Sequence, residues 1–214
     1  EGHLPSEAIR AVNSEPKESQ FYLLPKIHKE NNPGRPIVSA CSCPTVLISA
    51  FLDSVFQPLV TKLPTFVKDT NHALRLLGAF TFPDDSTERY LFTMDIVSLY
   101  TNIPHNDGLQ ALQYFLQKSS FDLNITTITR LAELVLTLNS FSFAEEHCSQ
   151  AKGVAMGTKM GPSYACLFVG YVEQQALQHY QGRAPSFYRR FIDDCLGVAT
   201  GPETDLLDFI NHMS

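Results

Sequence analysis

Three aspartates in this sequence interrupt stretches that are otherwise apolar and strand-like. Asp95 lies within LFTMDIV (91–97), and Asp193 and Asp194 lie within FIDDCL (191–196). A carboxylate inside an apolar strand is costly to bury unless it is paired or binds a metal ion. Each aspartate, taken alone, is more often an exposed turn residue or a hydrogen-bonded strand end. If the two strands are neighbours, however, the three carboxylates converge and repel one another unless a cation lies between them.

Phosphoryl or nucleotidyl transfer is the chemistry that such a carboxylate cluster could perform. Hard oxygen ligands suit Mg²⁺ or Mn²⁺. Two such ions, about 3.5–4 Å apart, are a recurrent device for in-line displacement at phosphorus. One ion lowers the pKa of the attacking hydroxyl, and the other neutralises the leaving phosphate. We therefore expect two Mg²⁺ ions here, with Mn²⁺ as an alternative.

The elements that must position these aspartates follow from periodicity and turn signals. Residues 21–29 and 35–40 predict a two-stranded basic ribbon with a turn at NNPG (31–34). A buried strand is predicted at 90–100, a strand begins at 140–143, and a hairpin at 186–200 has the carboxylates at its tip. Helices are predicted at 45–60, 66–77, 104–118, 124–139, 163–181 and 203–213. One short helix is expected within residues 1–20, and a loop at 83–86.

A glycine-containing loop, GVAMGTKMGP (153–162), enters the helix predicted from residue 163. Its glycines Gly153, Gly157 and Gly161 are four residues apart. Glycine permits a ligand to approach the backbone closely, and a helix entry presents free amides. The loop could also be an ordinary glycine-rich turn.

These segments, in this order, resemble the fingers and palm of a reverse transcriptase. FTMDIVSLYTNIP is similar to the family's motif A, GVAMGTKMGPSYA to motif B, and YRRFIDD to motif C. The phrases LPKIHK, GRPIVSA, DIVSLYTNIPH and AMGTKMGP further resemble Penelope-like retroelements, a branch whose polymerase is similar to telomerase. The resemblance covers the chain from about residue 18 to about residue 200.

The resemblance implies an α+β fold made of right-hand polymerase fingers and palm. The fingers would occupy residues 1–88, with their N-terminal part incomplete. The palm would occupy residues 89–214, with an interleaved fingers segment and an antiparallel sheet packed on helices. The chain begins with Glu1 rather than Met and ends soon after motif C. We therefore expect a partial chain without the helical thumb.

The resemblance also implies a role for each matching residue of motifs A and C. Asp95 would bind both metal ions with help from the Ile96 carbonyl, and Asp193 would be the second metal ligand. Asp194 would be a supporting acid. Three backbone amides would approach the triphosphate, those of Val97, Ser98 and Leu99.

Further residues would bind the nucleotide, template and primer. Lys26 and Arg35 in the basic ribbon would hold nucleotide phosphates, unless they are simply solvated surface charges. Tyr100 would exclude a 2′-hydroxyl and so favour deoxynucleotides, unless it is a packed core tyrosine. Met156 and Gly157 would lie against the nucleotide, although Met156 stands where many retroviral enzymes have Gln. The residues expected near template and primer are Gly153, Lys159, Gly161 and Pro162.

The function implied is RNA-directed DNA synthesis by a retrotransposon enzyme. Its partners would be an RNA or DNA template, a DNA primer and deoxynucleoside triphosphates. One alternative is an inactive relic, or a nucleic-acid-binding module that has been co-opted. The other is an RNA-dependent RNA polymerase, against which Tyr100 argues because that class resembles D-x₄-D at this place.

Composition narrows the function classes further. The 214 residues are 44% hydrophobic and 18% charged, with a net charge of −6. This composition is that of a globular protein and excludes a membrane span, a fibrous rod and a disulfide-stapled miniprotein. Residues 1–75 carry 8 basic and 7 acidic side chains, whereas residues 76–214 carry 8 basic and 15 acidic side chains. Bound cations would offset the excess of negative charge in the second segment. The five cysteines show no zinc spacing, so we expect free thiols in the nucleus or cytoplasm.

Overall fold

The computed structural model of the chain describes residues 15–27, 30–83, 88–121 and 123–214. The short helix expected within residues 1–20 and the loop expected at 83–86 lie mostly outside these ranges. The described chain forms two compact units. Unit 1 comprises the described residues up to Leu59 together with Ser98–Phe168, and unit 2 comprises Val60–Val97 together with Val169–Ser214.

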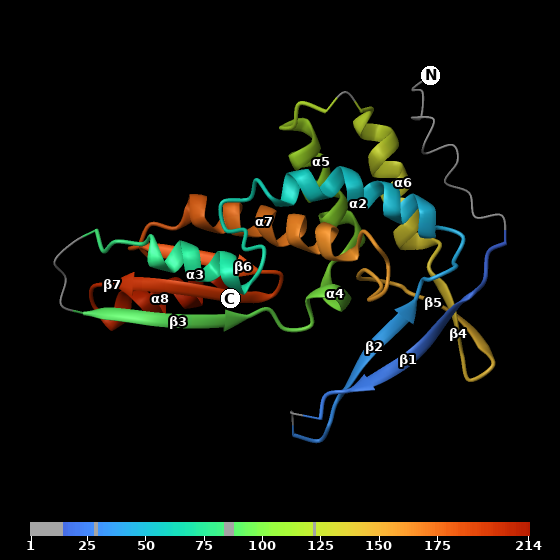
Figure 1. Cartoon of the computed structure of the whole chain (residues 1–214), viewed down its shortest axis with the longest axis horizontal. Helices are drawn as coiled ribbons and strands as arrows, with labels where there is room; N and C mark the ends of the chain where they lie inside the picture. Colours follow the sequence, from blue (N-terminus) through green and yellow to red (C-terminus); the bar gives the residue numbers. More distant parts are fainter. Residues whose placement is uncertain (1–14, 28–29, 84–87, 122) are drawn as a thin grey trace. The chain divides into compact units, whose positions relative to one another are not determined.

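Unit 1 contains a four-stranded sheet and a group of helices (Figure 1). Its strands are β1 (Ser19–Pro25), β2 (Gly34–Ser39), β4 (Ser140–Phe143) and β5 (Glu146–Ser149), in the order β2-β1-β4-β5. Its helices are α2 (Val46–Val60, nearly all of it), α4 (Leu99–Asn102), α5 (His105–Gln117), α6 (Ile125–Thr137) and the first part of α7 (Gly161–His179).

The predicted basic ribbon is confirmed, but it belongs to a larger sheet. β1 and β2 are antiparallel, with Leu24 opposite Arg35. β1 also pairs in parallel with β4, and the ring of Phe21 stacks on that of Phe141 at a centroid distance of 5.5 Å. This parallel pairing joins segments more than a hundred residues apart in the chain, so local patterns could not predict it. The strand β5 was likewise not predicted.

Four helices of unit 1, α2, α5, α6 and α7, lie where the apolar spacing predicted them, whereas the single turn of α4 falls at the end of the segment predicted to be a strand. The four helices bury large side chains, among them Phe56 of α2, Leu112 of α5, Ile128 of α6 and Leu167 of α7. The Asn124 side chain caps α6 by accepting a hydrogen bond from the Thr127 amide at 2.9 Å. The α5–α6 pair is therefore an ordinary amphipathic packing of two helices.

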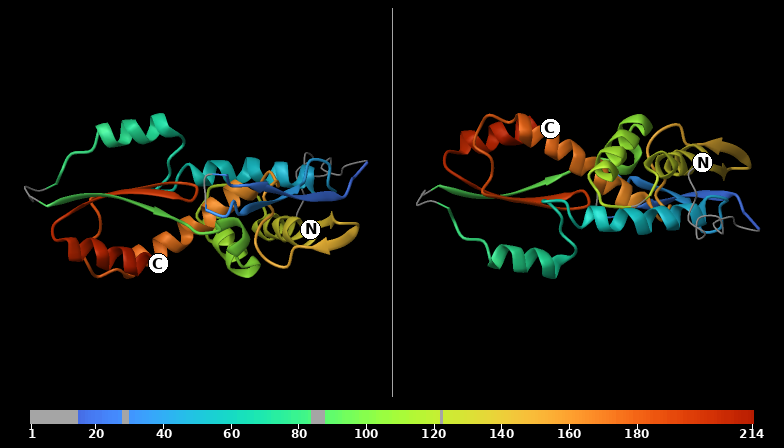
Figure 2. Two further views of the ribbon diagram at one scale, coloured as in Figure 1. Left: turned by 90° about the horizontal axis from the view of Figure 1, so that it is seen from below. Right: turned by 90° about the horizontal axis from the view of Figure 1, so that it is seen from above.

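Unit 2 contains a three-stranded antiparallel sheet between helices. Its strands are β3 (Arg89–Asp95), β6 (Phe187–Phe191) and β7 (Asp194–Thr200), in the order β3-β7-β6. Its helices are α3 (Thr70–Gly78), α8 (Glu203–Met213) and the last part of α7. Figure 2 shows α3 on one side of this sheet and α8 on the other.

The helix predicted at 66–77 begins four residues late, at Thr70. Asp69 is its N-cap, and the Asp69 carboxylate accepts a hydrogen bond from the His72 amide at 2.8 Å. Asp is a favoured N-cap because its oxygen satisfies an amide that the first helical turn leaves unpaired. The capping residue therefore sets the boundary, which the apolar spacing alone placed too early.

The buried strand predicted at 90–100 is a shorter, half-buried strand. β3 ends at Asp95, and Ser98 then adopts a left-handed conformation (φ 54°) before the single turn of α4. Tyr90, Phe92 and Met94 of β3 face the core. The alternate residues, Asp95 among them, are exposed, because successive side chains of a strand point to opposite faces. Asp95 is thus not a buried carboxylate.

The core of unit 2 packs one face of the sheet against α8. The rings of Phe92 and Tyr188 meet Phe209 edge-on, at centroid distances of 6.1 and 5.9 Å. Gly197 of β7 lies opposite Phe92 in the sheet, and a Cβ at Gly197 would lie 2.2 Å from the Phe92 ring. Glycine at position 197 therefore leaves room for the Phe92 ring to pack against β7.

The remaining fold-level predictions have mixed outcomes. The five cysteines, all within the described residues, are thiols, and Cys43, Cys166 and Cys195 are buried. In the part of the chain that the structure describes, no helix is long and apolar enough to span a bilayer. The assignment of residues 1–88 to fingers and 89–214 to palm stays a prediction, and the two compact units divide the chain at other residues.

Candidate active site

The sheet of unit 2 brings the three predicted aspartates to one end. β3 and β7 are antiparallel neighbours, and their register places Asp95 directly opposite Asp194. Asp193 lies in the turn that joins β6 to β7, and its carbonyl accepts a hydrogen bond from the Ile96 amide at 3.1 Å. The condition under which the three carboxylates would converge, that the two strands are neighbours, is therefore met. The hairpin predicted at 186–200 is confirmed as well, with its carboxylates at the tip.

The turn between β6 and β7 has an unusual backbone. Phe191 pairs with Asp194, which leaves Ile192 and Asp193 as a two-residue turn. Ile192 has a φ of 56°, in the left-handed region that two-residue hairpin turns usually fill with glycine or asparagine. A β-branched residue there is strained, so other contacts must hold the turn that presents Asp193.

Electrostatics at this end of the sheet favour a bound cation. Partial burial, followed by the negative charges of Asp193 and Asp95, raises the pKa of Asp194 above its usual range. Asp95 and Asp194 are nevertheless both exposed. The cluster is therefore an accessible anionic site whose members repel one another, which is the situation that a divalent cation relieves.

The residues present fit a hard divalent cation by the chemistry of their donors. Carboxylate and carbonyl oxygens are the ligands that Mg²⁺ and Mn²⁺ prefer. Within the described ranges, however, no three His, Cys, Asp or Glu side chains are arranged so that they could hold a metal ion. The structure thus supplies the donors at one place, without side-chain orientations that converge on a common point.

A cavity of about 560 Å³ adjoins the aspartates in unit 2. Asp95 and Asp194 both line it, and so do Thr93 of β3 and Phe191 of β6. Val67 and Ala73 line it as well. The carboxylates are therefore accessible from a space large enough for part of a small substrate.

In unit 1, the glycine-containing loop is bound to the segment after motif A. The Gly153 amide donates to the Ile103 carbonyl at 2.9 Å, and the Val154 amide donates to the Tyr100 carbonyl at 2.7 Å. Gly153 has a φ of 79°, and a Cβ there would lie 2.5 Å from the Tyr100 carbonyl oxygen. The chain's own backbone therefore requires glycine at this position.

The second glycine of the loop lies against the basic ribbon. Gly157 has a φ of 140°, and a Cβ there would lie 2.2 Å from the Val38 carbonyl oxygen. On the other side of this contact, the Val38 amide donates to the Met156 carbonyl at 3.1 Å. The loop and β2 are thus fastened together by backbone contacts that a side chain at position 157 would break.

Replacing Gly157 by alanine is expected to lower the free energy of unfolding by about 1–3 kcal/mol, because the backbone is strained there for any other residue. Chemical denaturation measures the loss. Gly78→Ala at the end of α3 is the matched control, since a Cβ there would meet nothing within 4 Å. Its expected effect is within about 1 kcal/mol, in the stabilising direction. Equal effects of the two substitutions would contradict this account of the loop.

A row of polar residues on α2 anchors the loop and the start of α7. The Ser49 hydroxyl accepts from the Met160 amide at 2.9 Å. Ser163 donates to Asp53 at 2.5 Å and accepts from Gln57 at 3.1 Å. Residues 49, 53 and 57 are four apart, so they share one face of the helix. This polar stripe on an apolar helix was a visible signal that the sequence reasoning did not use.

The predicted basic and exposed residues have varied placements in unit 1. Lys26 and Arg35 lie at the turn end of the β1–β2 ribbon, with Lys26 half-buried and Arg35 exposed. Lys159 and Pro162 are exposed, whereas Gly161 is buried at the first position of α7. The charged groups of Arg35 and Lys159 are therefore accessible to phosphates from solvent, and that of Lys26 is partly so.

The residues that follow β3 are also mixed in exposure. Val97 is 75% exposed, Ser98 is exposed and Leu99 is buried. Tyr100 is half-buried, and its carbonyl is used by the loop. Of the three amides predicted to approach a triphosphate, those of Val97 and Ser98 belong to exposed residues.

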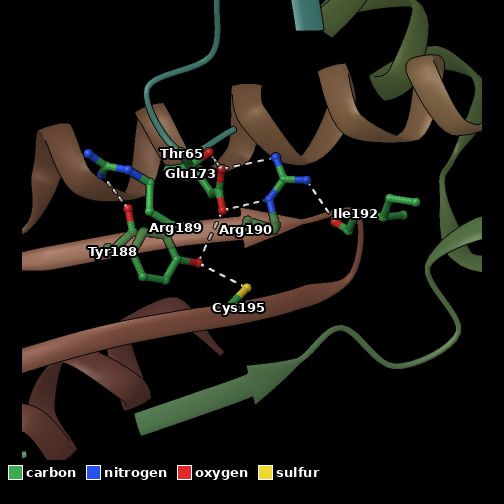
Figure 3. Close-up of polar contacts among 7 residues, drawn as sticks. All are labelled: Thr65, Glu173, Tyr188, Arg189, Arg190, Ile192 and Cys195. Carbon is green, nitrogen blue, oxygen red and sulfur yellow. Dashed lines mark hydrogen bonds and ion pairs between the residues drawn. The ribbon is translucent and has the colours of Figure 1, made fainter. Parts of the chain in front are cut away.

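A buried charge network next to the aspartate turn was not predicted. Figure 3 shows Glu173 of α7 and Arg190 of β6 facing one another, with Thr65 and Tyr188 also bound to the Glu173 carboxylate. Burial and the Glu173 charge raise the pKa of Tyr188 well above its usual range, so its hydroxyl remains a donor. A lone acid in an apolar helix and an arginine three residues before Asp193 were the available signals.

Comparison with known proteins identifies the family. Residues 27–214 match the family described as reverse transcriptase (RNA-dependent DNA polymerase). No curated protein matches the chain significantly.

Several solved structures share the fold at low sequence identity. The apo telomerase of Candida tropicalis, truncated from its C-terminal domain, matches with a TM-score of 0.67 at 10% identity, over 94% of this chain and 47% of that one. The telomerase of Candida albicans, in complex with a TWJ fragment of telomeric RNA, matches with a TM-score of 0.67 at 11% identity, over 98% and 40%. The BmCPV RNA-dependent RNA polymerase at its elongation state matches with a TM-score of 0.62 at 11% identity, over 92% and 19%. The chain spans less than half the length of these structures.

Proposed function

The chain belongs to the reverse transcriptase family, and from that premise we propose that it catalyses RNA-directed DNA synthesis. In this reaction the 3′-hydroxyl of a primer attacks the α-phosphate of a deoxynucleoside triphosphate, and pyrophosphate leaves. The observation that carries the proposal is the register of β3 and β7, which places Asp95 opposite Asp194 and beside Asp193 in the turn. This arrangement supplies oxygen donors at one accessible end of a sheet.

The aspartates would hold two divalent cations, Mg²⁺ or Mn²⁺. Asp95, with the Ile96 carbonyl, and Asp193 would be the ligands, and Asp194 would be the supporting acid. When bound, such ions lower the pKa of an attacking hydroxyl and neutralise a leaving phosphate. Partial burial, followed by the negative charges of Asp193 and Asp95, raises the pKa of Asp194, and a cation at this place would offset that unfavourable environment.

Other residues would bind the nucleotide and the nucleic acid. Lys26 and Arg35 would contact phosphates, and the planar guanidinium of arginine suits bidentate binding. The amides of Val97–Leu99 would approach the triphosphate, and Met156 and Gly157 would lie against the nucleotide. The residues proposed near template and primer are Gly153, Lys159, Gly161 and Pro162.

Tyr100 would select deoxynucleotides by occupying the space of a 2′-hydroxyl. Replacing Tyr100 by valine is expected to lower the preference for deoxynucleotides over ribonucleotides by roughly 10–200-fold, the range for small steric differences in a pocket. The Tyr100 carbonyl would keep its bond to Val154, because only the side chain changes. Competition between labelled nucleotides in primer extension measures the ratio.

Tyr114→Val on α5 is the control for this experiment, since it removes a half-buried ring from the same unit. It is expected to leave the preference unchanged. An unchanged preference in the Tyr100→Val variant would remove Tyr100 from the nucleotide site.

RNA synthesis is the specific alternative, because viral RNA-dependent RNA polymerases share this fold. Primer extension on an RNA template with deoxynucleotides or ribonucleotides distinguishes the two functions. The proposal predicts extension with deoxynucleotides in Mg²⁺ and little with ribonucleotides. Equal use of both would favour RNA synthesis, and extension with neither would favour an inactive relic or a binding module.

The biological setting proposed is a Penelope-like retroelement. The phrases LPKIHK and AMGTKMGP support this branch, and the fold shared with two telomerases is consistent with it. The partners would be an RNA template, a DNA primer and deoxynucleotides. A nuclear or cytoplasmic location would suit five cysteines that remain thiols.

A further inference from the structure

The ion pair between Arg190 and Glu173 is almost completely buried in unit 2. Each residue is 3% exposed. Arg190 Nε donates to Glu173 Oε1 at 2.8 Å, and Arg190 Nη2 donates to Glu173 Oε2 at 3.1 Å. Burying two charges is expensive, and a well-packed apolar pair is often at least as stable. The pair is therefore poor evidence for stability alone and calls for a different explanation.

The third nitrogen of the Arg190 guanidinium contacts the turn that carries Asp193. Arg190 Nη1 donates to the Ile192 carbonyl at 2.7 Å, as Figure 3 shows. Ile192 is the strained residue of the turn, with its φ of 56°. The bond thus holds the carbonyl of the peptide group that joins Ile192 to Asp193. This hydrogen bond therefore helps to keep Ile192 in its strained conformation, which the turn would otherwise leave.

The backbone of Arg190 is fixed as well. Its amide donates to the Thr65 carbonyl at 2.6 Å, and its carbonyl accepts from the Val67 amide at 2.9 Å. The segment at residues 65–67 therefore lies along the free edge of β6. Arg190 cannot shift to follow the turn if the turn moves, so its side chain acts from a rigid base.

Glu173 fixes the orientation of the guanidinium. Its carboxylate also accepts hydrogen bonds from Thr65 Oγ1 at 2.8 Å and from the Tyr188 hydroxyl at 3.1 Å. Four donors thus hold the carboxylate, and the carboxylate holds two of the three guanidinium nitrogens. The remaining nitrogen, Nη1, donates one of its hydrogens to the Ile192 carbonyl.

We propose that Arg190, oriented by Glu173, is a positioning residue that fixes the Ile192–Asp193 turn for nucleotide transfer. This inference rests on the proposed polymerase function. Arg190 acts through the Ile192 carbonyl and touches no substrate. Its planar fork can serve the Glu173 carboxylate and the Ile192 carbonyl together, whereas a lysine ammonium, as a compact point charge, cannot span both.

Arg190→Lys is the test variant, because it keeps the charge next to Glu173 and removes the fork. Hydrogen exchange of the amides of Ile96 and of residues 192–194 gives a readout independent of activity. The Ile96 amide is informative because it donates to the Asp193 carbonyl. In the purified protein, these amides are expected to exchange at least about tenfold faster in Arg190→Lys, because local opening of the turn costs less free energy.

Two control variants separate positioning from general stability. Tyr188→Phe removes a hydroxyl from the same buried network without touching the turn. Arg189→Lys changes the adjacent arginine, which donates to the Tyr188 carbonyl at 2.7 Å and lies over the Phe187 ring. Neither is expected to accelerate exchange at the turn more than at the rest of unit 2.

Steady-state nucleotide addition completes the test. Arg190→Lys is expected to lower kcat roughly 10–100-fold with the KM for the deoxynucleotide nearly unchanged, since positioning acts on the reacting geometry. Arg130→Lys, a change that keeps the charge of an exposed residue of α6 outside this network, is expected to retain kcat. Exchange at the turn that is no faster in Arg190→Lys than in the controls would overturn the proposal, and so would an unchanged kcat. If the unsubstituted protein transfers no nucleotide, the polymerase function fails, while the exchange result still decides whether Arg190 holds the turn.

Discussion

Replacing Asp95 by asparagine is expected to slow nucleotide addition by about 10³-fold, because a lost cation ligand removes several kcal/mol of transition-state stabilisation. Asparagine keeps the size of the side chain and removes its charge. Since Asp95 is exposed and faces Asp194, the thermal unfolding midpoint is not expected to fall. Single-turnover primer extension in Mg²⁺ measures the rate.

The control for this substitution is Asp69→Asn in the same unit. Asp69 undergoes the same chemical change, and asparagine remains a good N-cap for α3. Its rate is expected to match that of the unsubstituted protein. A rate within about tenfold of normal in Asp95→Asn would show that the β3 carboxylate holds no essential ion.

Replacing Glu173 by glutamine is expected to destabilise the protein by about 3–5 kcal/mol, because it leaves the buried Arg190 guanidinium without a counter-charge. For a chain of this size, roughly 2–4 °C of melting temperature correspond to each kcal/mol. The expected loss is therefore about 6–20 °C in thermal denaturation followed by circular dichroism.

The matched control is Glu133→Gln on α6. Glu133 pairs with Arg130 at 2.6 Å, and their side chains are 39% and 65% exposed. An exposed pair of this kind contributes only about 0–1 kcal/mol, so a shift of a few degrees at most is expected. Replacing both Glu173 and Arg190 by methionine should recover part of the loss, because no unpaired charge then remains buried. If the Glu173→Gln variant had the same melting temperature as the Glu133→Gln control, the account of the buried network would be contradicted.

The sequence predicted the strands that carry the aspartates better than the contacts that surround them. Asp95, Asp193 and Asp194 were singled out because acids inside apolar strands are unusual, and β3 and β7 do bring them together. The strand around Asp95 was predicted to be buried, with an exposed aspartate as the alternative, and the alternation of β3 leaves Asp95 on an exposed face. Mutual repulsion and accessibility, rather than desolvation alone, characterise this cluster.

What the sequence could not predict depends on contacts between distant residues. Helices such as α5 and α6 were predicted from local spacing, and a local cap explains where α3 begins. The pairing of β1 with β4 has no local signal, since strands that far apart can pair in many registers.

The support of the aspartate turn left only weak signals in the sequence, namely an acid alone in an apolar helix and an arginine three residues before Asp193. Only the tertiary structure shows that Glu173 and Arg190 are both buried and bound to one another. The left-handed φ of Ile192 could not be predicted either, because isoleucine rarely adopts it. Strain at such a residue is a feature that surrounding contacts impose.

The most direct measurement of the central claim is the addition of one deoxynucleotide to a primer on an RNA template. The unsubstituted protein and its Asp193→Asn variant are compared in Mg²⁺ under single-turnover conditions, with equal folding verified by circular dichroism. The account predicts addition by the unsubstituted protein and a rate at least about 10³-fold lower in the variant. Equal rates in the two proteins would contradict the assignment of Asp193 to the reaction.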